Sequence, residues 1–390
     1  MSPTSSKNEV SSSSPSSITG NTSGAANSGS SPGAATGAAS TGGSGGHVVP
    51  ATILYEHLSS SFDVQIVSDH RGSKFIDKNF YKYNVIDTPK ISKNIFLAPK
   101  SLILFIISLI KSFKFLKKNN IHSLISTGGY MSFPFCLAAK LLKLNIFLFE
   151  PNMVIGRSNN LMLRFSKKIF CYHENIINFP TKLKNKIIVI ERLLKKKIFT
   201  SNNKKNERSS YFKILIVGGS QGSSFFDNSI KQAICEFSTK QNTFVLQQIS
   251  NEEKKEEIKK AYDLSKVNHE LFSFDENLYK KIQDVDLAIT RCGASTLSDL
   301  VYHNIPFIGI PFPHAKDNHQ YYNGKYFSDL DCCWLLDQNK IDTNKILDLL
   351  LKIINDKDDY SNKKKNIEKI SSKNNWKKIN QKIINIINED

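Results

Sequence analysis

Short apolar runs alternate with longer, helix-like stretches along most of the chain. The runs in the first half are VQIVS (Val64–Ser68), SLIST (Ser123–Thr127), NIFLF (Asn145–Phe149), IFCYH (Ile169–His173) and KIIVI (Lys186–Ile190). A second series comprises KILIV (Lys213–Val217), TFVLQQ (Thr243–Gln248), LAIT (Leu287–Thr290), FIGIP (Phe307–Pro311) and CWLLD (Cys333–Asp337). Apolar runs without polar alternation, separated by helices, are typical of parallel strands covered on both faces. The pattern predicts an α/β protein with two doubly wound domains and a ligand cleft between them.

Composition divides the 390 residues into four segments. Residues 1–41 are mainly Ser, Gly, Ala, Asn, Thr and Pro, and are predicted to be a disordered, low-complexity tail. Residues 42–198 form the first predicted domain, and the polar stretch 199–212 is predicted to be a linker. Residues 213–390 form the second predicted domain, including helices that close it.

The net charge of +18 and the clustering of lysines suit anionic partners, although a chain rich in Lys, Asn and Ile throughout gives the same excess. Outside Lys111–Lys118, the lysine clusters are largely free of interleaved aromatic residues, so nucleic acid is not expected as a partner. The six cysteines form no C-x-x-C pair and no zinc-like spacing, so no metal site is predicted.

One stretch, NIFLAPKSLILFIISLIKSFKFLKK (Asn94–Lys118), is very apolar and ends in lysines. Its apolar run is shorter than the ~20 residues that span a bilayer. Two interpretations stay open: a buried core helix, or an interfacial helix in contact with anionic lipid, which we favour for part of it.

Three stretches of the second domain could bind a nucleotide sugar. KILIVGGSQGSS (Lys213–Ser224) is a buried strand that runs into a glycine loop and a helix, which suits a diphosphate, although a tight turn without a ligand fits the same residues. LAITRCGASTLSDL (Leu287–Leu300) places Asp299 one turn into a helix, where a carboxylate can accept hydrogen bonds from a ribose diol or complement the helix dipole. The loop PFPHAKDNHQYYN (Pro311–Asn323) is rich in hydrogen-bonding groups suited to a sugar.

Three stretches of the first domain have the same character. They are GGSGGHVVPA (Gly42–Ala51), STGGYMSFP (Ser126–Pro134) and FEPNMVIGRSNNLM (Phe149–Met162). The first is unusual because GAATGAAS (Gly33–Ser40) stands where an apolar strand is expected. Either these small residues still fill a central strand, or an added segment has replaced it.

Taken together and in this order, the six stretches resemble the MurG family of glycosyltransferases. The resemblance implies the GT-B architecture, with two Rossmann-like domains facing a cleft, and an inverting reaction without a cofactor or an essential metal. It further implies transfer of N-acetylglucosamine (GlcNAc) from UDP-GlcNAc to the muramyl 4-hydroxyl of lipid I, which forms lipid II for peptidoglycan. The expected location is the cytoplasmic face of the inner membrane, as a peripheral protein bound to anionic lipids.

The resemblance also assigns residues to the donor and acceptor sides. The expected donor-binding residues are Gly218, Gly219, Ser220, Gln221, Gly222, Phe274, Asp275, Arg291, Asp299, His319, Gln320, Asn323 and Lys195. The expected acceptor-binding residues are Gly42, Gly43, Ser44, Gly45, Gly46, Gly128, Gly129, Tyr130, Asn152, Gly156 and Asn159. Asp299 stands where the family has Glu, and Phe149-Glu150-Pro151-Asn152 replaces His-Glu-Gln-Asn.

A base must remove the proton of the attacking hydroxyl, and the sequence leaves two candidates, His47 and Glu150. Helix-terminal N–H groups would absorb the negative charge that develops on UDP. Two other functions stay open at this stage. One is transfer of a UDP-sugar to a different lipid-linked acceptor, and the other is sugar-nucleotide binding without catalysis.

Overall fold

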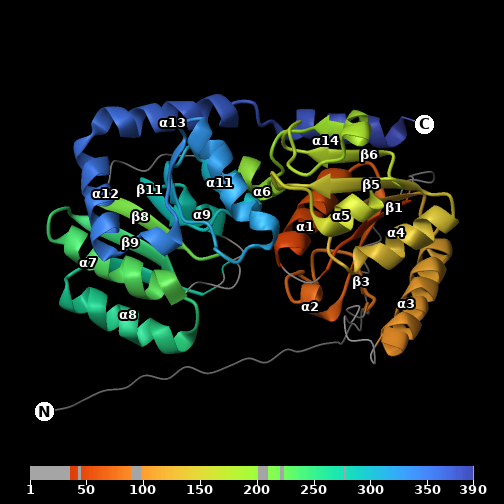
Figure 1. Cartoon of the computed structure of the whole chain (residues 1–390), viewed down its shortest axis with the longest axis horizontal. Coiled ribbons are helices and arrows are strands. Elements are labelled where there is room, and N and C mark those ends of the chain that lie inside the picture. Colours follow the sequence, from red (N-terminus) through yellow and green to blue (C-terminus); the bar gives the residue numbers. More distant parts are fainter. Residues whose placement is uncertain are drawn as a thin grey trace, which may run out of the picture. The chain divides into compact units, whose positions relative to one another are not determined.

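Two parallel sheets organise the chain, as the apolar runs predict (Figure 1). The computed structural model describes residues 36–42, 45–88, 98–200, 210–219, 224–273, 275 and 278–389, which cluster into one compact unit. The first sheet has seven strands in the order β3-β2-β1-β4-β5-β6-β7, and the second has six in the order β10-β9-β8-β11-β12-β13. All strand pairs in the described residues are parallel.

The first domain contains the elements from β1 to α6. Its strands are β1 (Thr36–Ser40), β2 (Asp63–Ser68), β3 (Tyr83–Val85), β4 (Ser123–Ser126), β5 (Asn145–Glu150), β6 (Lys168–Cys171) and β7 (Ile187–Val189). Its helices are α1 (Gly45–Leu58), α2 (His70–Ser73), α3 (Ala98–Lys118), α4 (Ser132–Leu141), α5 (Arg157–Met162), the 3-10 turn η1 (Thr181–Lys186) and α6 (Lys196–Thr200).

The second domain repeats the arrangement. Its strands are β8 (Phe212–Val217), β9 (Thr243–Gln248), β10 (Asn268–Phe272), β11 (Leu287–Thr290), β12 (Phe307–Gly309) and β13 (Cys333–Leu335). Its helices are the π-helical turn η2 (Phe226–Ile230), α7 (Lys231–Ser238), α8 (Glu252–Leu264), α9 (Leu278–Ile282), α10 (Ala294–Tyr302), η3 (Lys316–Asn318), α11 (His319–Asp329), η4 (Gln338–Lys340), α12 (Thr343–Asn355) and α13 (Lys357–Ser371). The last helix is α14 (Trp376–Asn388).

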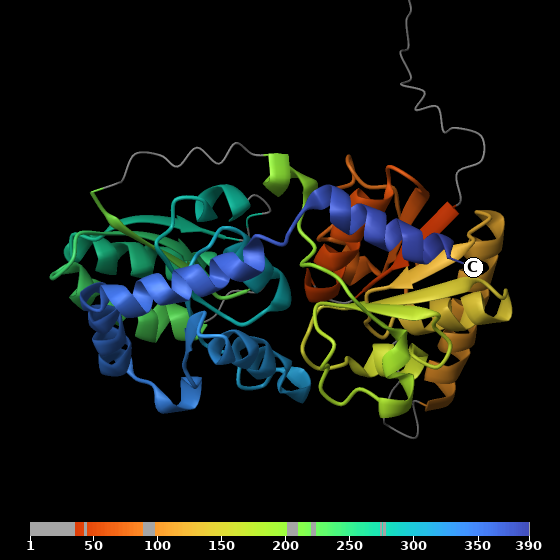
Figure 2. The ribbon, with the colours of Figure 1, turned by 90° about the horizontal axis from the view of Figure 1, so that it is seen from above.

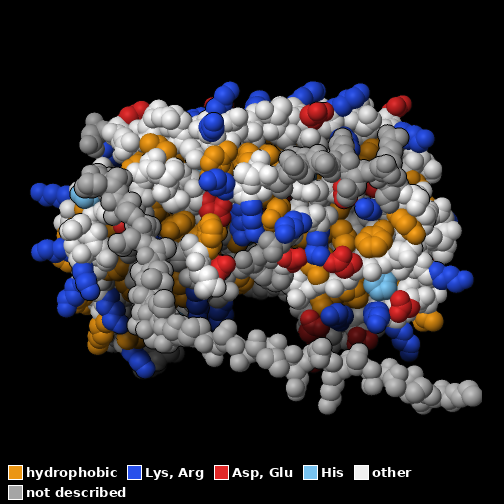
Figure 3. Space-filling view, turned by 180° about the vertical axis from the view of Figure 1, so that it is seen from behind, with side chains coloured by type: hydrophobic (Ala, Val, Ile, Leu, Met, Phe, Trp, Pro, Cys, Tyr) orange, Lys and Arg blue, Asp and Glu red, His pale blue; other side chains and the backbone are white. Residues whose placement is uncertain are grey.

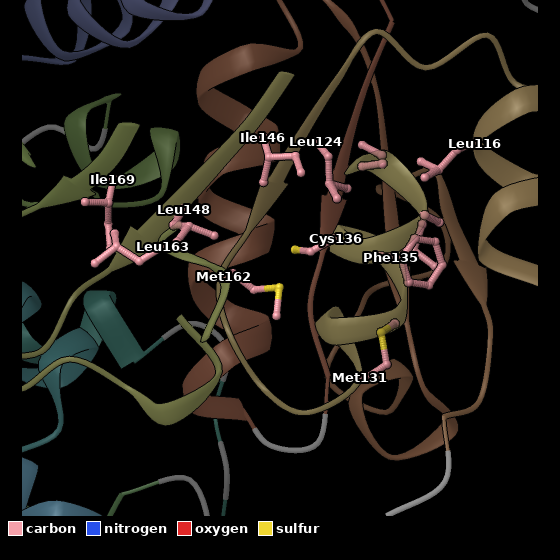
Figure 4. Packing of buried hydrophobic residues seen from close by; sticks show 14 of the residues in the cluster. Leu116, Leu124, Met131, Phe135, Cys136, Ile146, Leu148, Met162, Leu163 and Ile169 are labelled. Carbon is pink, nitrogen blue, oxygen red and sulfur yellow. The ribbon is translucent and has the colours of Figure 1, made fainter. Parts of the chain in front are cut away.

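Apolar side chains cover both faces of each sheet. One face of the first sheet packs under α3, α4 and α5, where Leu124 and Leu148 meet Phe135 and Met162 (Figure 4). The other face carries Phe147, Phe149 and Phe170 and packs against α1. In the second domain, Ile214 and Ile216 face α7 and α12, whereas Leu215 and Val217 face α10. Burial on both faces explains why the runs lack polar alternation.

The predicted tail boundary at residue 41 is wrong for its last residues. Thr36–Ser40 form β1, an inner strand of the first sheet, paired with β2 on one side and β4 on the other. Ala38 and Ala39 are buried. Small residues have weak strand propensity alone, but two flanking strands supply hydrogen-bond partners on both edges. Of the alternatives for this segment, the small residues fill the strand. Residues 1–35 lie outside the described residues.

The predicted end of the second domain also needs correction. Helix α14 crosses back and packs on the first domain, as the dark blue helix over the orange elements in Figure 2 shows. Its buried Ile379 and Ile383 join the cluster of Leu54 and Phe147. Trp376 stacks on His57 of α1, with ring centroids 3.8 Å apart. Apolar residues at helical spacing predict a buried face but do not say which domain that face covers.

Candidate active site

The predicted site residues gather where each sheet reverses its strand order. In the first sheet β1 and β4 lie side by side although they are not consecutive, and in the second sheet β8 and β11 do. In doubly wound sheets the crevice at this point, beyond the carboxyl ends of the strands, is the usual ligand site. The glycine-rich loops after β1, β4 and β8 and the loop after β11 all start there.

His47 lies in the first turn of α1, directly after β1. Its Nδ1 is 3.0 Å from the carbonyl oxygen of Thr127, and the Thr127 hydroxyl donates to the His47 carbonyl at 3.0 Å. A carbonyl oxygen only accepts, so the proton sits on Nδ1 and Nε2 carries the lone pair. Burial lowers the pKa of His47, and the positive groups of His319 and Lys316 lower it further, against the raising effects of the Thr127 bond and Glu150.

Glu150, at the end of β5, organises the loop that follows it. Its Oε1 accepts from the backbone N–H and the side-chain amide of Asn152, at 3.2 and 3.0 Å. Its Oε2 accepts from the Gly156 N–H at 2.8 Å and from the Asn159 amide at 3.0 Å. The carboxylate is buried and accepts four hydrogen bonds, so it holds the predicted acceptor residues in one network.

The loop after β4 depends on two glycines. Gly128 and Gly129 have φ of +89° and +86°. A side chain on Gly129 would place its Cβ 2.8 Å from the Gly42 carbonyl oxygen, and one on Gly128 would crowd the His47 ring. Only glycine adopts this backbone without strain while two loops approach so closely. The structure therefore brings the predicted Gly42, His47 and Gly128–Gly129 together.

Tyr130 completes this side of the site through a residue that the sequence reasoning missed. Its hydroxyl donates to Asp69 Oδ2 at 3.2 Å, and Asp69 also pairs with Arg71 at 2.8 Å. The Arg71 guanidinium lies 5.0 Å from the centre of the Tyr130 ring. Asp69 follows β2 directly, and its position at the carboxyl end of a strand was the signal that could have found it.

Asn323 joins the two domains. Its Oδ1 accepts from the backbone N–H of Met153 at 2.9 Å, and its Nδ2 donates to Asn152 Oδ1 at 3.0 Å and to the Cys292 carbonyl at 3.1 Å. The side chain is buried. The predicted donor residue Asn323 and the predicted acceptor residue Asn152 therefore contact each other directly.

Asp299 and Lys195 also come together from different domains. Burial raises the pKa of Asp299 to about 7, and the nearby Lys195 ammonium partly opposes this. A carboxyl with a pKa near neutrality, held in a partly buried site, is the kind of group that marks functional sites.

The other described donor residues lie in the loops of the second domain. Arg291 is buried and donates to the Ile310 and Pro311 carbonyls at 3.0 and 3.1 Å, so it shapes the loop after β12. The side-chain Oε1 of Gln320 accepts from the Phe312 N–H at 2.9 Å, and His319 Nδ1 lies 2.8 Å from the Lys316 backbone carbonyl. Asp275 pairs with Lys281 at 3.8 Å.

The remaining predicted residues lie in the glycine loops after β1 and β8 and next to Asp275. Gly45 and Gly46 begin α1, and Gly218 and Gly219 follow β8, with Gly219 at a φ of +90°. The remaining predicted residues lie outside the described residues: Gly43, Ser44, Ser220, Gln221, Gly222 and Phe274.

A second contact between the domains surrounds Arg192, in the segment between β7 and α6. Its guanidinium lies 4.9 Å from the Tyr172 ring centre and 4.6 Å from that of Phe327, so aromatic rings of both domains contact it. His173 Nε2 lies 3.2 Å away from the guanidinium. Burial, together with Arg192, lowers the pKa of His173 to about 3, so His173 stays neutral and can accept this hydrogen bond.

Helix α3 exposes much of its apolar surface. Leu102 and Ile103 are each 59% exposed, and Leu104, Ile106, Ile107 and Ile110 are exposed as well. A buried core helix would not leave these side chains in solvent, so that interpretation is excluded for this face. In the part of the chain that the structure describes, no helix is long and apolar enough to cross a membrane. Residues 94–97 lie outside that part.

The basic charge is spread out over the surface. In the view from behind, Lys and Arg side chains project along much of the outline, mixed with hydrophobic ones (Figure 3). Within the described ranges, no group of three His, Cys, Asp or Glu side chains has an arrangement that could hold a metal ion.

Comparison with known domains gives the class of this two-domain fold. Residues 38–171 match the glycosyltransferase family 28 N-terminal domain, and residues 213–383 match the glycosyltransferase family 28 C-terminal domain. The protein is a hexosyltransferase of the GT-B architecture.

Relatives define the family within this class. The chain is 46% identical over 348 residues to the UDP-N-acetylglucosamine--N-acetylmuramyl-(pentapeptide) pyrophosphoryl-undecaprenol N-acetylglucosamine transferase of Pelagibacter ubique, covering 89% of this chain and 97% of that protein. It is 33% identical over 325 residues to the enzyme of the same name from Rickettsia felis, covering 80% and 89%. The chain belongs to this family, the MurG family.

Solved structures agree on the fold. MurG of Acinetobacter baumannii has a TM-score of 0.72 at 20% identity and covers 91% of this chain and 100% of that one. A plant glycosyltransferase from Phytolacca americana, complexed with UDP-2fluoro-glucose and pterostilbene, has a TM-score of 0.65 at 10% identity, covering 90% and 99%. At these identities the likeness concerns the fold alone.

Proposed function

We propose that the protein transfers GlcNAc from UDP-GlcNAc to the muramyl 4-hydroxyl of lipid I, with inversion at the anomeric carbon. Two relatives that are named as an N-acetylglucosamine transferase match this chain over 97% and 89% of their own length. This likeness supports the proposal. The observation that carries the proposal is His47, which is held by Thr127 with Nε2 as its lone-pair nitrogen and lies within electrostatic range of His319 in the second domain.

In the proposed reaction His47 is the base. The attacking hydroxyl gives its proton to Nε2, and the oxygen forms a bond to the anomeric carbon while the bond from that carbon to UDP breaks. A lowered pKa keeps the imidazole neutral before the reaction, as a base requires. Glu150 is less suited, because each of its oxygens already accepts two hydrogen bonds. We assign Glu150 the role of positioning Asn152, Gly156 and Asn159.

The second domain would hold the donor. Gly218, Gly219 and the first turn of α10 would offer backbone N–H groups to the diphosphate, where negative charge develops as UDP leaves. Asp299 would accept hydrogen bonds from the ribose hydroxyls once it is ionised. His319 and Gln320 would face the donor sugar, while Arg291 shapes their loop through the Ile310 and Pro311 carbonyls.

Because the proposed acceptor is a lipid, we expect the enzyme to act at a membrane surface. The exposed apolar face of α3, with Lys111, Lys114, Lys117 and Lys118 exposed beside it, supports peripheral contact with anionic lipid. We propose that this contact is on the cytoplasmic face of the inner membrane, where UDP-GlcNAc is available.

A transfer assay tests the proposed function. Wild-type protein, His47→Ala and Asp299→Ala are supplied with UDP-GlcNAc and a soluble lipid I analogue. We expect His47→Ala to lower kcat by ~10²–10⁴-fold with little change in the KM for the donor. We expect Asp299→Ala mainly to raise that KM. Donor binding by the wild type without transfer to this acceptor would overturn the proposal, and transfer to another lipid-linked acceptor alone would redirect it.

A further inference from the structure

An ion pair joins the two domains next to the site. Arg157 Nε donates to Asp317 Oδ2 at 3.1 Å, and Arg157 Nη2 donates to Oδ1 at 2.8 Å. The two parallel hydrogen bonds fix both the distance and the angle between the groups. Neither residue is among those predicted to bind donor or acceptor.

Each partner is attached to a loop of the proposed site. Arg157 begins α5 and follows Gly156, whose N–H donates to Glu150, and it stands two residues before Asn159, which donates to the same Glu150 oxygen. Asp317 stands two residues before His319 in the loop that leads into α11. A shift of either partner would therefore move a loop of its own domain.

The Asp317 loop has a demanding backbone. Asp317 and the following Asn318 both have left-handed φ values, 52° and 54°. Asp and Asn tolerate this conformation better than most residues, but it still has a cost that surrounding contacts must offset. The bidentate bond from Arg157 is one such contact, and it comes from the other domain.

A buried hydrogen-bonded path runs between the same two loops. Glu150 accepts from the Asn152 amide, and Asn152 Oδ1 accepts from Asn323. Asn323 also donates to the Cys292 carbonyl in the second domain. Asn323 donates to a residue of each domain, and Asn152 in turn donates to Glu150, so the bond from Asn323 to Asn152 forms only when the two domains are in contact.

We propose that Arg157 and Asp317 are positioning residues that latch the donor loop onto the acceptor loop, with the Asn152–Asn323 bond as the buried half of the latch. The latch brings the His319 loop to the His47 side of the site. Its catalytic consequence rests on the proposed function, whereas the closure of the two loops does not.

The charges support a latch that can open. Arg157 is 77% exposed, and the Arg157 hydrogen bond, helped by the nearby His319 and Lys316, lowers the pKa of Asp317. Asp317 is therefore ionised throughout the neutral range. Exposed ion pairs add little to global stability and are screened by salt. We expect the ion pair to act on the ratio of closed to open protein instead, because a small free energy from the pair changes this ratio several-fold.

The experiment is a double-mutant cycle with Arg157→Gln, Asp317→Asn and the double variant. Asn keeps the tolerance for the left-handed backbone at 317. The first readout is hydrogen exchange without substrates, in peptides covering residues 150–160 and 315–323. We expect each single variant to raise exchange in both peptides, including the one from the other domain, and the double variant to add nothing further.

The second readout is transfer kinetics. We expect each single variant to lower kcat/KM by roughly five- to tenfold, with the double variant no worse than either single. Arg157→Lys, which keeps the charge but loses the fork, should give an intermediate value. The matched control is Lys325→Gln with Asp329→Asn, an exposed pair within α11 at 2.7 Å, which should change neither readout.

Exchange that rises only in the mutated loop, or additive effects in the double variant, would overturn the latch. If the wild type fails to transfer GlcNAc while exchange still rises across both domains, the proposed function fails and the latch stands.

Discussion

His47 is neutral under the conditions where a base is needed. Burial lowers its pKa from the ordinary value of 6.5, so protonation of the free enzyme occurs only in more acidic solution. We therefore expect the acid limb of kcat, measured at saturating donor so that the ionisation of Asp299 for donor binding does not enter, to have its midpoint below pH 6.5. A pH–rate profile from pH 4.5 to 8 measures it. Gln cannot titrate, so if His47→Gln shows the same acid limb, a group other than His47 causes it.

Asp299 links the site to stability. Its pKa in the folded protein is raised to about 7, mainly by burial, whereas an unfolded Asp titrates near ~3.9. The folded protein therefore holds this proton more tightly, and stability is lost as the pH rises from about 4 to about 7. Asn carries no such penalty.

We thus expect the free energy of unfolding of Asp299→Asn, minus that of the wild type, to be larger at pH 8 than at pH 4.5. Urea unfolding of both proteins at the two pH values tests this. An equal difference at both pH values would show that the carboxyl does not titrate in this way.

At the scale of elements, β1 shows that a strand can be specified by its neighbours. Gly37 has open space where a Cβ would lie, with only the Ser123 carbonyl oxygen at 3.9 Å. We expect Gly37→Ala to raise the free energy of unfolding by ~0.5–1 kcal/mol, because glycine has more backbone freedom to lose.

Gly129→Ala is the contrasting change for the same measurement, denaturant unfolding. It should destabilise the protein, since φ is +86° and the Gly42 carbonyl stands 2.8 Å from the new Cβ. Gly37→Ala with no gain or a loss would mean that β1 is already fully packed.

Helix α3 is expected to carry membrane contact on its exposed face. Ile103 and Ile107 lie one turn apart and are both exposed. The double variant Ile103→Glu, Ile107→Glu should bind less to vesicles that contain anionic lipid, because it places two negative charges on the helix face that contacts the lipid. Vesicle co-sedimentation measures the loss. Leu264→Glu, at an exposed leucine on α8, is the control and should bind as the wild type does.

The sequence predicted the elements whose side chains are buried on both faces. All ten apolar runs overlap strands, from β2 to β13, and in most of them two covered faces leave an unbroken apolar signal. The edge strand β7 has no buried residue but was still predicted, because its residues are all apolar. Three strands were missed. The small residues of β1 carry no apolar signal, and the edge strands β3 and β10 have no buried residue and contain polar positions that interrupt the apolar pattern.

The site was predictable where a motif sits at the end of a strand. Gly42, His47, Gly128 and Glu150 come together as strand order implies. Contacts between elements far apart in sequence were not predictable, since spacing says nothing of them. The Arg157–Asp317 pair spans 160 residues, and the bond from Asn323 to Asn152 spans 171.

At the scale of the whole molecule, α14 joins the last part of the described chain to the core of the first domain. Ile383 is fully buried against the first domain. We expect Ile383→Ala to cost ~2–4 kcal/mol of unfolding free energy, by loss of buried surface and creation of a cavity. Lys382→Ala, exposed on the same helix, should cost little.

Hydrogen exchange locates the damage from Ile383→Ala. Protection should fall in the first domain, around Leu54 and Phe147, before it falls around Ile214 and Ile216 in the second. Equal loss in both domains would mean that they unfold as one unit.

The crossing of α14 also sets an order of events during synthesis. The first domain leaves the ribosome early, yet the part of the apolar surface around Leu54 and Phe147 that α14 covers stays open until residues 376–388 have been translated. The second domain is by then already outside and can fold. The domain that is made first is therefore completed last, and a nascent chain halted before α14 would present that surface to chaperones.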